Sequence, residues 1–263
     1  MEQSKISPLA VVSPLAKIGK NVIIHPFAVV EQGTEIGDET EIMSGAQVLY
    51  GSVIGKNCKI HSYAVVGGEP QDLKYEGEDS KAIIGDYTII REFATVNRGT
   101  KSKGKTVIGS HCLIMAYAHI AHDCILKDRI IIGNSCQIAG EVEIDDYAIV
   151  SAASLVHQFV RISQHVMIQG GCRLTKDIPP YILVGRDPAV YCGINIVGLR
   201  RRGFSNEQIF QINDVYRTLY QRGLNHTQAI TAIAEEIPDS YERNLIVSFI
   251  RNSERGIIRG NMD

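Results

Sequence analysis

Apolar residues recur at every sixth position through most of the chain. Of the 29 positions that are multiples of six between residues 6 and 174, 26 carry Ile, Val or Leu, and only Asp72, Glu78 and Ser102 do not. An amphipathic helix repeats its apolar positions every 3.6 residues and a half-buried strand every two, so neither element alone has this period. A short fixed period sustained over this length predicts a repeat fold in which each unit packs on its neighbours.

A second column, four residues after each apolar position, carries small side chains. Five of the six cysteines fall in it: Cys58, Cys112, Cys124, Cys136 and Cys172. Cysteine in such a column behaves as a small buried apolar residue, so the pattern predicts packing and neither disulfides nor metal ligation. Glycines such as Gly37 and Gly55 directly follow the large apolar residue, where we expect turns that need a permissive backbone.

The hexads predict a mainly β protein, a parallel β-helix, and they resemble the left-handed β-helix of hexapeptide-repeat acyltransferases. In that fold each hexad forms one flat face and three hexads form one triangular coil. Residues three hexads apart therefore stack on adjacent coils, one strand spacing apart. The hand follows from the resemblance, because ordinary crossover connections are right-handed.

Two interruptions and a change of period divide the chain. The hexads stop at about residues 67–82 and 98–107, where Gly and polar residues predict loops that leave the prism. Loops on a rigid scaffold often carry function. The β-helix with these two loops is predicted to occupy residues 1–189. Residues 190–263 show helical spacing of apolar residues and a capping box that begins at Ser205, so they predict a small C-terminal α-helical domain.

Composition narrows the range of partners. The 263 residues carry a net charge of −2, which gives no reason to expect a nucleic acid partner. No stretch approaches the roughly 20 apolar residues of a membrane span, and the first residues lack the apolar core of a signal peptide. We expect a cytoplasmic protein with reduced thiols and no membrane span.

The candidate chemistry centres on His122. The stacking rule places His122, Gly140 and Gln158 in one column on successive coils, with His157 beside Gln158. A histidine on the surface of a β-helix usually has no special role. A histidine that stacks on a glycine amide unshielded by a side chain, however, suits proton abstraction beside an oxyanion donor.

Two questions about this stretch stay open from the residues alone. Asp123 can orient His122 only if the chain turns there, because neighbours on a strand face opposite ways. His119, His122 and Asp123 also admit a metal-site interpretation. Hexapeptide-repeat carbonic anhydrases bind zinc through three histidines, two of which are five residues apart, and no such pair occurs here. We expect no metal and no cofactor.

Five segments together identify a family. They are Gln71–Tyr75, Arg98–Thr100, His119–Cys124, His157–Phe159 and Gly198–Phe204. In this combination, and over the full chain, they resemble the UDP-N-acetylglucosamine 3-O-acyltransferases of lipid A biosynthesis. The resemblance implies a homotrimer with active sites between neighbouring prisms. It also implies transfer of an (R)-3-hydroxyacyl chain from acyl carrier protein to the 3-hydroxyl of UDP-N-acetylglucosamine.

The resemblance implies a role for individual residues. His122 is the expected general base, and the Gly140 amide is the expected oxyanion donor. The expected substrate-binding residues are Gln71, Asp72, Lys74, His119, His157, Gln158, Asn195, Arg201 and Arg202. Gly170 matches the end stop of a hydrocarbon ruler, and it forms a column of small residues with Asn134 and Ala152. The missing side chain predicts a long acyl chain of roughly 14 carbons or more, since each buried methylene contributes about 0.8 kcal/mol.

Three positions differ from the family pattern. Asn97 and Glu141 stand where His is common, and Val197 stands where Glu is common. These differences affect the finer contacts to sugar and nucleotide and leave the base and the oxyanion glycine in place.

Three alternative functions are less favoured. The related N-acyltransferase of the same pathway carries an extra N-terminal uridine-binding domain, for which hexads that begin at Ile6 leave no room. An acetyl-coenzyme A-dependent acetyltransferase of small molecules would need neither the helical tail nor Gln71–Tyr75. The His122–Gly140 column argues against a non-enzymatic scaffold.

Overall fold

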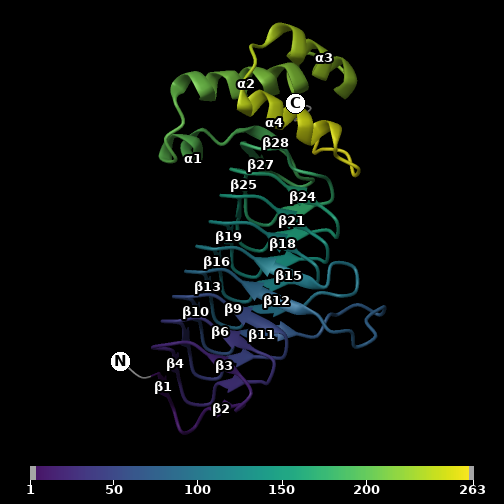
Figure 1. The fold of residues 1–263 in the computed structure, drawn as a ribbon. Coiled ribbons are helices and arrows are strands. Elements are labelled where there is room, and N and C mark those ends of the chain that lie inside the picture. The colour runs from purple at the N-terminus through teal and green to yellow at the C-terminus, as the bar shows by residue number, and fades with distance from the viewer. Residues whose placement is uncertain (1–3, 261–263) are drawn as a thin grey trace.

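The main body is a three-sided prism of short strands, as seen in the computed structural model, which describes residues 4–260 (Figure 1). From β1 (Lys5–Ile6) to β26 (Arg173–Leu174), consecutive strands fall in different sheets. Each of these strands pairs in parallel with a strand one coil away, as β17 (His119–Ile120) does with β20 (Gln137–Ile138). The predicted left-handed parallel β-helix is therefore confirmed.

Three sheets form the sides of the prism. The first sheet contains β1 (Lys5–Ile6), β4 (Ile23–Ile24), β7 (Glu41–Ile42), β10 (Lys59–Ile60), β13 (Ile89–Ile90), β16 (Leu113–Ile114), β19 (Ile131–Ile132), β22 (Ile149–Val150), β25 (Met167–Ile168), β27 (Ile182–Gly185) and β28 (Val190–Ile194). The second contains β2 (Val11–Val12), β5 (Val29–Val30), β8 (Gln47–Val48), β11 (Val65–Gly68), β14 (Thr95–Asn97), β17 (His119–Ile120), β20 (Gln137–Ile138), β23 (Leu155–Val156) and β26 (Arg173–Leu174). The third contains β3 (Lys17–Ile18), β6 (Glu35–Ile36), β9 (Ser52–Ile54), β12 (Lys81–Ile84), β15 (Lys105–Ile108), β18 (Ile125–Leu126), β21 (Glu143–Ile144) and β24 (Arg161–Ile162).

The strand register explains the six-residue period. Ile120 pairs with Ile138, and both side chains are fully buried inside the prism. The residue before each of them, His119 and Gln137, points to the outside, because successive strand residues alternate between faces. The five cysteines of the small column are buried thiols, as predicted.

The turns use a different column from the one predicted. Residues with positive φ recur three positions after the apolar residue, and they include Asn57 and Asp123 at 54° and 58°. The prediction that Gly37 and Gly55 supply this conformation is wrong, because neither has a positive φ. A Cβ atom on Gly37 would lie 2.6 Å from the backbone of Gly55, so the missing side chain there lets successive coils approach.

Two loops interrupt the coils near the middle of the prism and project from the same side (Figure 1). The first loop, residues 69–80, connects β11 to β12, and the second loop, residues 98–104, connects β14 to β15. Arg98 joins them by donating a hydrogen bond to the Tyr75 hydroxyl. The two loops fall within the stretches at about residues 67–82 and 98–107 where the hexads stop, and they contact each other.

Four helices cover the C-terminal end of the prism (Figure 1). They are α1 (Ile196–Arg201), α2 (Asn206–Gln221), α3 (His226–Glu236) and α4 (Tyr241–Arg251). The capping box of Ser205 and Gln208 starts α2 as predicted. Residues 190–194 form β28, which pairs antiparallel with β27, so the first helix begins only at Ile196. Between residues 4 and 260 there is no helix long and apolar enough to cross a membrane.

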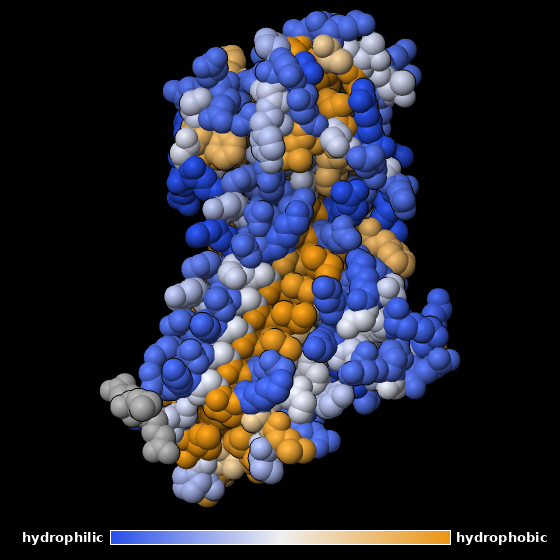
Figure 2. All heavy atoms as spheres, viewed as in Figure 1, coloured by the Kyte–Doolittle hydropathy of each residue, from blue (hydrophilic) through white to orange (hydrophobic). Residues whose placement is uncertain are grey.

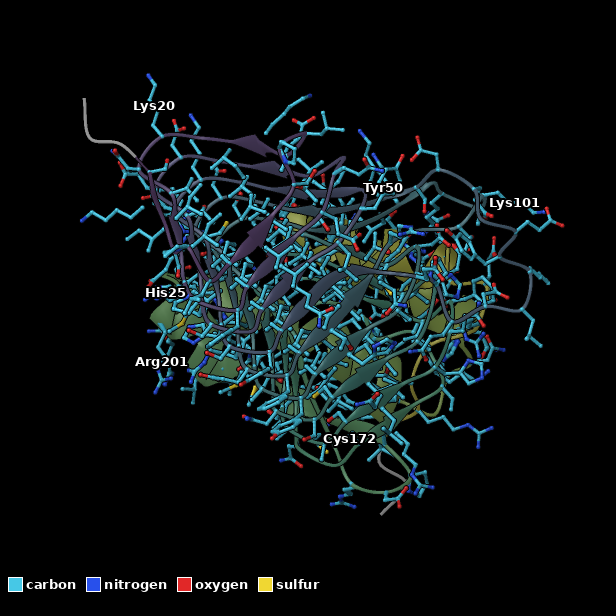
Figure 3. All side chains as sticks on the ribbon, turned by 90° about the horizontal axis from the view of Figure 1, so that it is seen from below. Lys20, His25, Tyr50, Lys101, Cys172 and Arg201 are labelled. Carbon is cyan, nitrogen blue, oxygen red and sulfur yellow. The ribbon has the colours of Figure 1, made fainter. Side chains whose placement is uncertain are left out.

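The surface of the prism is uneven in polarity. An apolar band runs along its length between polar flanks (Figure 2). Seen from below, Lys101 of the second loop and Arg201 of α1 lie on opposite sides of the molecule (Figure 3). This separation matters for the site, because Arg201 is a candidate substrate-binding residue, and so are Gln71, Asp72 and Lys74 of the first loop, which the second loop contacts.

Candidate active site

A groove of about 560 Å³ runs along the second sheet beside the first loop. Its floor is formed by outward-facing strand residues, among them His119, Gln137, Leu155 and Arg173. Its wall includes Gln71, His122, Gly140, His157 and Gln158. Six of the residues expected to form the site therefore lie around one groove.

His122 and Gly140 are stacked as the hexad register predicts. The Glu141 N–H donates a hydrogen bond to the His122 carbonyl over 3.0 Å. A Cβ atom on Gly140 would lie 2.5 Å from Nε2 of His122, so the imidazole occupies the space that a side chain would need. Among the described residues, the Gly140 N–H donates to no protein acceptor and is left for a ligand oxygen.

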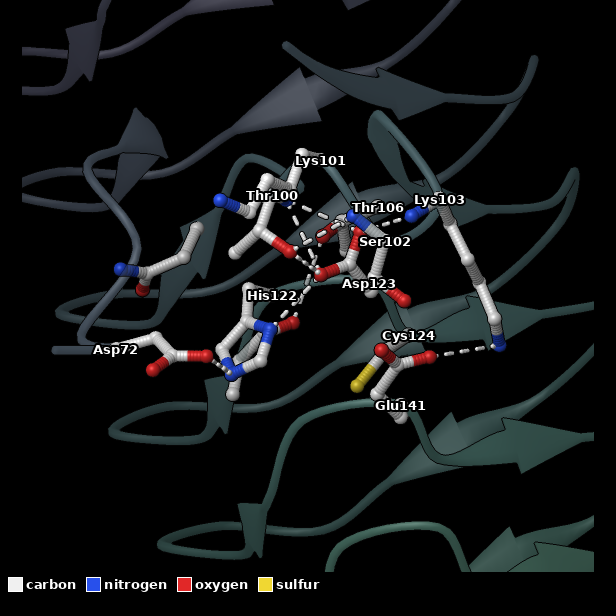
Figure 4. A network of polar contacts seen from close by, with 12 residues as sticks. Asp72, Thr100, Lys101, Ser102, Lys103, Thr106, His122, Asp123, Cys124 and Glu141 are labelled. Atoms are coloured by element: carbon white, nitrogen blue, oxygen red, sulfur yellow. Dashed lines mark hydrogen bonds and ion pairs between the residues drawn. The ribbon is translucent and has the colours of Figure 1, made fainter. Parts of the chain in front are cut away.

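Asp123 orients the imidazole. The positive φ of Asp123 places a turn at this point, and its Oδ2 lies 2.9 Å from Nδ1 of His122 (Figure 4). The carboxylate is fully buried. A hydrogen bond at one ring nitrogen selects the tautomer and fixes the ring, so Nε2 is the nitrogen available on the groove side.

The second loop holds Asp123 in place. The Thr100 N–H donates to Oδ1 over 3.0 Å, and the Thr100 hydroxyl donates to Oδ2 over 2.6 Å. The Lys103 N–H donates to Oδ1 over 3.1 Å. Sequence reasoning missed this role of the loop, because the loop is distant in sequence and two of its three donor groups are main-chain N–H groups. The turn at Asp123 was detectable, since Asn21, Gly33 and Asn57 occupy the same hexad position.

The first loop brings a second carboxylate to the imidazole. Oδ2 of Asp72 lies 3.8 Å from Nε2 of His122, and Oδ1 of Asp72 accepts a hydrogen bond from the Lys74 N–H over 2.9 Å. The Lys74 side chain is exposed and makes no contact with His122. A hydroxyl group that enters between Asp72 and His122 is therefore within reach of both side chains.

The other two histidines of the groove, His119 and His157, differ in burial. Oγ1 of Thr95 lies 2.7 Å from Nδ1 of His119, and burial, followed by the charge of His122, lowers the pKa of His119. His119 is therefore neutral near pH 7. His157 is exposed at the rim, 3.3 Å from the guanidinium of Arg255.

Asn195, Arg201 and Arg202 lie elsewhere. They line a separate groove of about 550 Å³ over the first sheet, which shares no residue with the groove at His122. Asn195 caps α1 by accepting a hydrogen bond from the Gly198 N–H over 3.1 Å. The Arg202 guanidinium lies 5.1 Å from the centre of the Tyr147 ring, and its Nη1 is buried without a partner. One chain alone therefore does not bring these residues to His122.

Gly170 lies outside both grooves as one chain forms them. It is exposed in the turn that follows β25, and a Cβ atom there would meet only the Ala152 carbonyl at 3.1 Å. The column of Asn134, Ala152 and Gly170 thus follows a corner of the prism and not the floor of the groove.

Two of the three residues that differ from the family pattern form polar contacts, and the third is exposed. The Asn97 side chain donates a hydrogen bond to the Glu69 carbonyl and so ties the first loop to the prism. Glu141 forms an ion pair with Lys103 at 3.4 Å. Val197 is 62% exposed at the second groove. In residues 4–260, His, Cys, Asp and Glu form no group of three or more that could hold a metal ion.

A triangular prism of hexads with a histidine–carboxylate pair facing a free glycine amide defines a class, the hexapeptide-repeat acyltransferases. The family described as bacterial transferase hexapeptide (six repeats) matches residues 33–68 and 105–140. The family described as UDP N-acetylglucosamine O-acyltransferase, domain 2, matches residues 177–258. The first match covers part of the prism, and the second covers its end and the helices.

Individual relatives identify the family within this class. The acyl-acyl-carrier-protein–UDP-N-acetylglucosamine O-acyltransferase of Burkholderia lata is 42% identical over 259 residues, which cover 90% of this chain and 99% of the relative. LpxA of Bacteroides fragilis, a UDP-N-acetylglucosamine acyltransferase of known structure, is 56% identical with a TM-score of 0.96, covering 97% of this chain and 100% of that chain. The Francisella novicida UDP-N-acetylglucosamine acyltransferase is 41% identical with a TM-score of 0.94, covering 98% and 95%. The chain belongs to the acyl-carrier-protein-dependent UDP-N-acetylglucosamine O-acyltransferase family and is an acyltransferase.

Proposed function

We propose that this chain transfers an (R)-3-hydroxyacyl group from acyl carrier protein to the 3-hydroxyl of UDP-N-acetylglucosamine, the first step of lipid A biosynthesis. The names of its relatives support the two substrates. The observation that carries the proposal is the position of Nε2 of His122 directly over Gly140, whose N–H has no protein acceptor. The proposed location is the cytoplasm, which agrees with six free cysteines.

The proposed mechanism has two steps. His122 removes the proton of the sugar hydroxyl through Nε2 while the oxygen attacks the thioester carbonyl, because a hydroxyl is a weak nucleophile without a base. The negative charge that develops on the carbonyl oxygen is stabilised by the Gly140 N–H. Collapse of the tetrahedral intermediate breaks the C–S bond, and the protonated His122 returns its proton to the leaving thiolate. Asp123 stabilises the imidazolium between the two steps.

The remaining groove residues are proposed to bind the sugar and the acyl chain. Asp72 and Gln71 bind sugar hydroxyls, with Lys74 and His119 nearby, while His157 and Gln158 line the path of the substrate. The short distance of Asp72 to His122 and the placement of Gln71 in the groove wall support this assignment.

We propose a homotrimer in which neighbouring prisms share each site. Asn195, Arg201 and Arg202, the residues proposed for the nucleotide, lie over the first sheet, whereas His122 lies at the second. Only a neighbouring chain brings both sets to one substrate. From β13 onward the outward positions of the first sheet are apolar and suited to a covered surface: Ile89, Leu113, Ile131, Ile149, Met167 and Leu183.

The activity is tested by incubating the chain with UDP-N-acetylglucosamine and 3-hydroxyacyl carrier protein and detecting the O-acylated sugar nucleotide. His122→Ala should lower kcat by several orders of magnitude, whereas His226→Ala, a substitution of an exposed histidine in α3, should not. More than about a tenth of the activity in His122→Ala would remove it as the base. Transfer of acetyl from acetyl-coenzyme A instead would indicate a small-molecule acetyltransferase, and no transfer at all would indicate a scaffold.

The shared site is tested by combining two inactive variants of the chain in one trimer. Chains with His122→Ala and chains with Arg202→Ala should each be inactive, and co-expression should restore activity, because a mixed trimer contains sites with both residues intact. A fully active monomer in sedimentation at assay concentration would refute the trimeric site.

A further inference from the structure

Lys103 contacts both sides of the candidate active site. Its N–H donates to Asp123, the carboxylate that orients His122. Its Nζ lies 3.1 Å from Oε1 of Glu143. The same Nζ lies 3.4 Å from Oε2 of Glu141 (Figure 4). One residue of the second loop therefore connects the partner of the base to the coil that carries Gly140.

Glu141 is an unusual residue to find beside an oxyanion donor. It directly follows Gly140, and its side chain is only 11% exposed. Among residues 4–260, Lys103 is the cation that pairs with this carboxylate, whereas the more exposed Glu143 also lies 3.7 Å from Nε of Arg161. A carboxylate with so little exposure to solvent is unfavourable without a partner, so Glu141 depends on Lys103.

Lys103 remains charged in this position. Burial by itself lowers the pKa of Lys103, but the hydrogen bond and charge of Glu143, followed by those of Glu141, outweigh burial and raise it. The ion pair therefore persists near neutral pH.

We propose that Lys103 and Glu141 are positioning residues, an ion pair that fastens the second loop to the coil of Gly140 and neutralises the carboxylate beside the oxyanion site. This inference rests on the proposed function, because the charge matters only if an oxyanion forms at Gly140. An uncompensated negative charge in a poorly solvated site opposes a developing oxyanion. The positive charge of Lys103 offsets the negative charge of Glu141. The Lys103 N–H also donates a hydrogen bond to Asp123.

The first comparison uses two lysines of the same loop. Lys103→Met should lower kcat roughly tenfold or more. KM for UDP-N-acetylglucosamine should change little, since neither Lys103 nor Glu141 is proposed to contact the sugar. Lys101→Met is the matched control, because the exposed side chain of Lys101 pairs with the exposed Glu76 at 3.2 Å. Lys103→Arg keeps the charge and should retain most of the activity.

The second comparison separates charge from packing. Lys103→Met combined with Glu141→Gln should recover most of kcat, because the buried charge has been removed with its partner. Lys103→Met combined with Glu143→Gln retains the Glu141 charge and should stay as slow as Lys103→Met. Both double variants lose the same lysine and one carboxylate, and circular dichroism at the assay temperature shows that each is folded.

The outcomes are distinct. Equal kcat in Lys103→Met and Lys101→Met, or equal kcat in the two double variants, would overturn the positioning role while leaving the wild-type activity and the His122 assignment intact. A folded wild-type chain that transfers no acyl group would overturn the proposed function, and this inference with it. If Lys103→Met alone is unfolded, kcat of the two double variants, each compared with that of the wild type, tests the positioning role instead.

Discussion

The Cβ atom that Gly140 lacks would lie 2.5 Å from Nε2 of His122. This relationship sets the geometry of the candidate site, because in the proposed mechanism the same nitrogen reaches the substrate hydroxyl while the Gly140 N–H reaches the oxyanion. The separation of base and oxyanion donor therefore depends on the absence of one side chain.

Gly140→Ala keeps the main-chain N–H but should displace the His122 imidazole and lower kcat by about 100-fold, a loss within the range that a general base contributes. The control is Gly68→Ala, since a Cβ atom at Gly68 meets its nearest neighbours only at 3.9 and 4.0 Å. Steady-state kinetics on both variants provides the test. Activity in Gly140→Ala above about a tenth of that of the control would show that the contact is not required.

Asp72→Ala should raise KM for UDP-N-acetylglucosamine far more than KM for the acyl carrier protein, because the proposed contact is to a sugar hydroxyl. Asp79→Ala, in the same loop, removes a carboxylate that accepts a hydrogen bond from Tyr50 and lies outside the groove lining. Kinetics with each substrate varied in turn measures both constants. An equal rise for the two substrates would indicate loss of loop order instead.

Gly170→Met should shift the preferred acyl chain by several carbons toward shorter chains with little loss of rate on those chains. The exposed corner at Gly170 leaves room that a Met side chain would fill if a neighbouring prism closes the groove there. The measurement is a competition between carrier-protein thioesters of different lengths. An unchanged length preference would remove Gly170 from the ruler.

His165→Phe should make the fold less sensitive to acid. His165 stacks between Tyr147 and Tyr181, and burial, followed by the charge of Arg202, lowers its pKa to about 4 from its ordinary value of 6.5. The unfolded chain binds a proton near pH 6.5 while the folded chain does not, so this residue costs stability as the pH falls from 6.5 to about 4. Phe159 shows that Phe tolerates the positive φ of this hexad position.

The check on His165→Phe is thermal unfolding of both chains at several pH values. The Tm of the wild type should fall further between pH 6.5 and pH 4, by roughly 5 °C more than that of the variant. Parallel Tm curves over that range would show that His165 does not contribute to acid sensitivity.

Periodicity alone was enough to predict a parallel β-helix, because each hexad must bury its apolar residue against the coils above and below it. The triangular coil of three hexads and its hand came from the resemblance to hexapeptide-repeat acyltransferases. The stacking of His122 on Gly140 followed from the same register, which a backbone with one repeated geometry transmits without error over many coils. Helices α2, α3 and α4 were likewise predicted from local signals, such as the capping box at Ser205, which acts within one turn, whereas α1 was not predicted.

Tertiary structure decided what the repeat does not encode. The second loop reaches Asp123 through the main-chain N–H groups of Thr100 and Lys103, and main-chain donors leave no mark in side-chain patterns. The pairing of Lys103 with Glu141 joins residues on different elements across a loop of irregular shape. The sequence determined which residues share a column, because each coil has the same length. Only the folded loops determined which charged side chains form ion pairs near His122, because the loops do not follow the repeat.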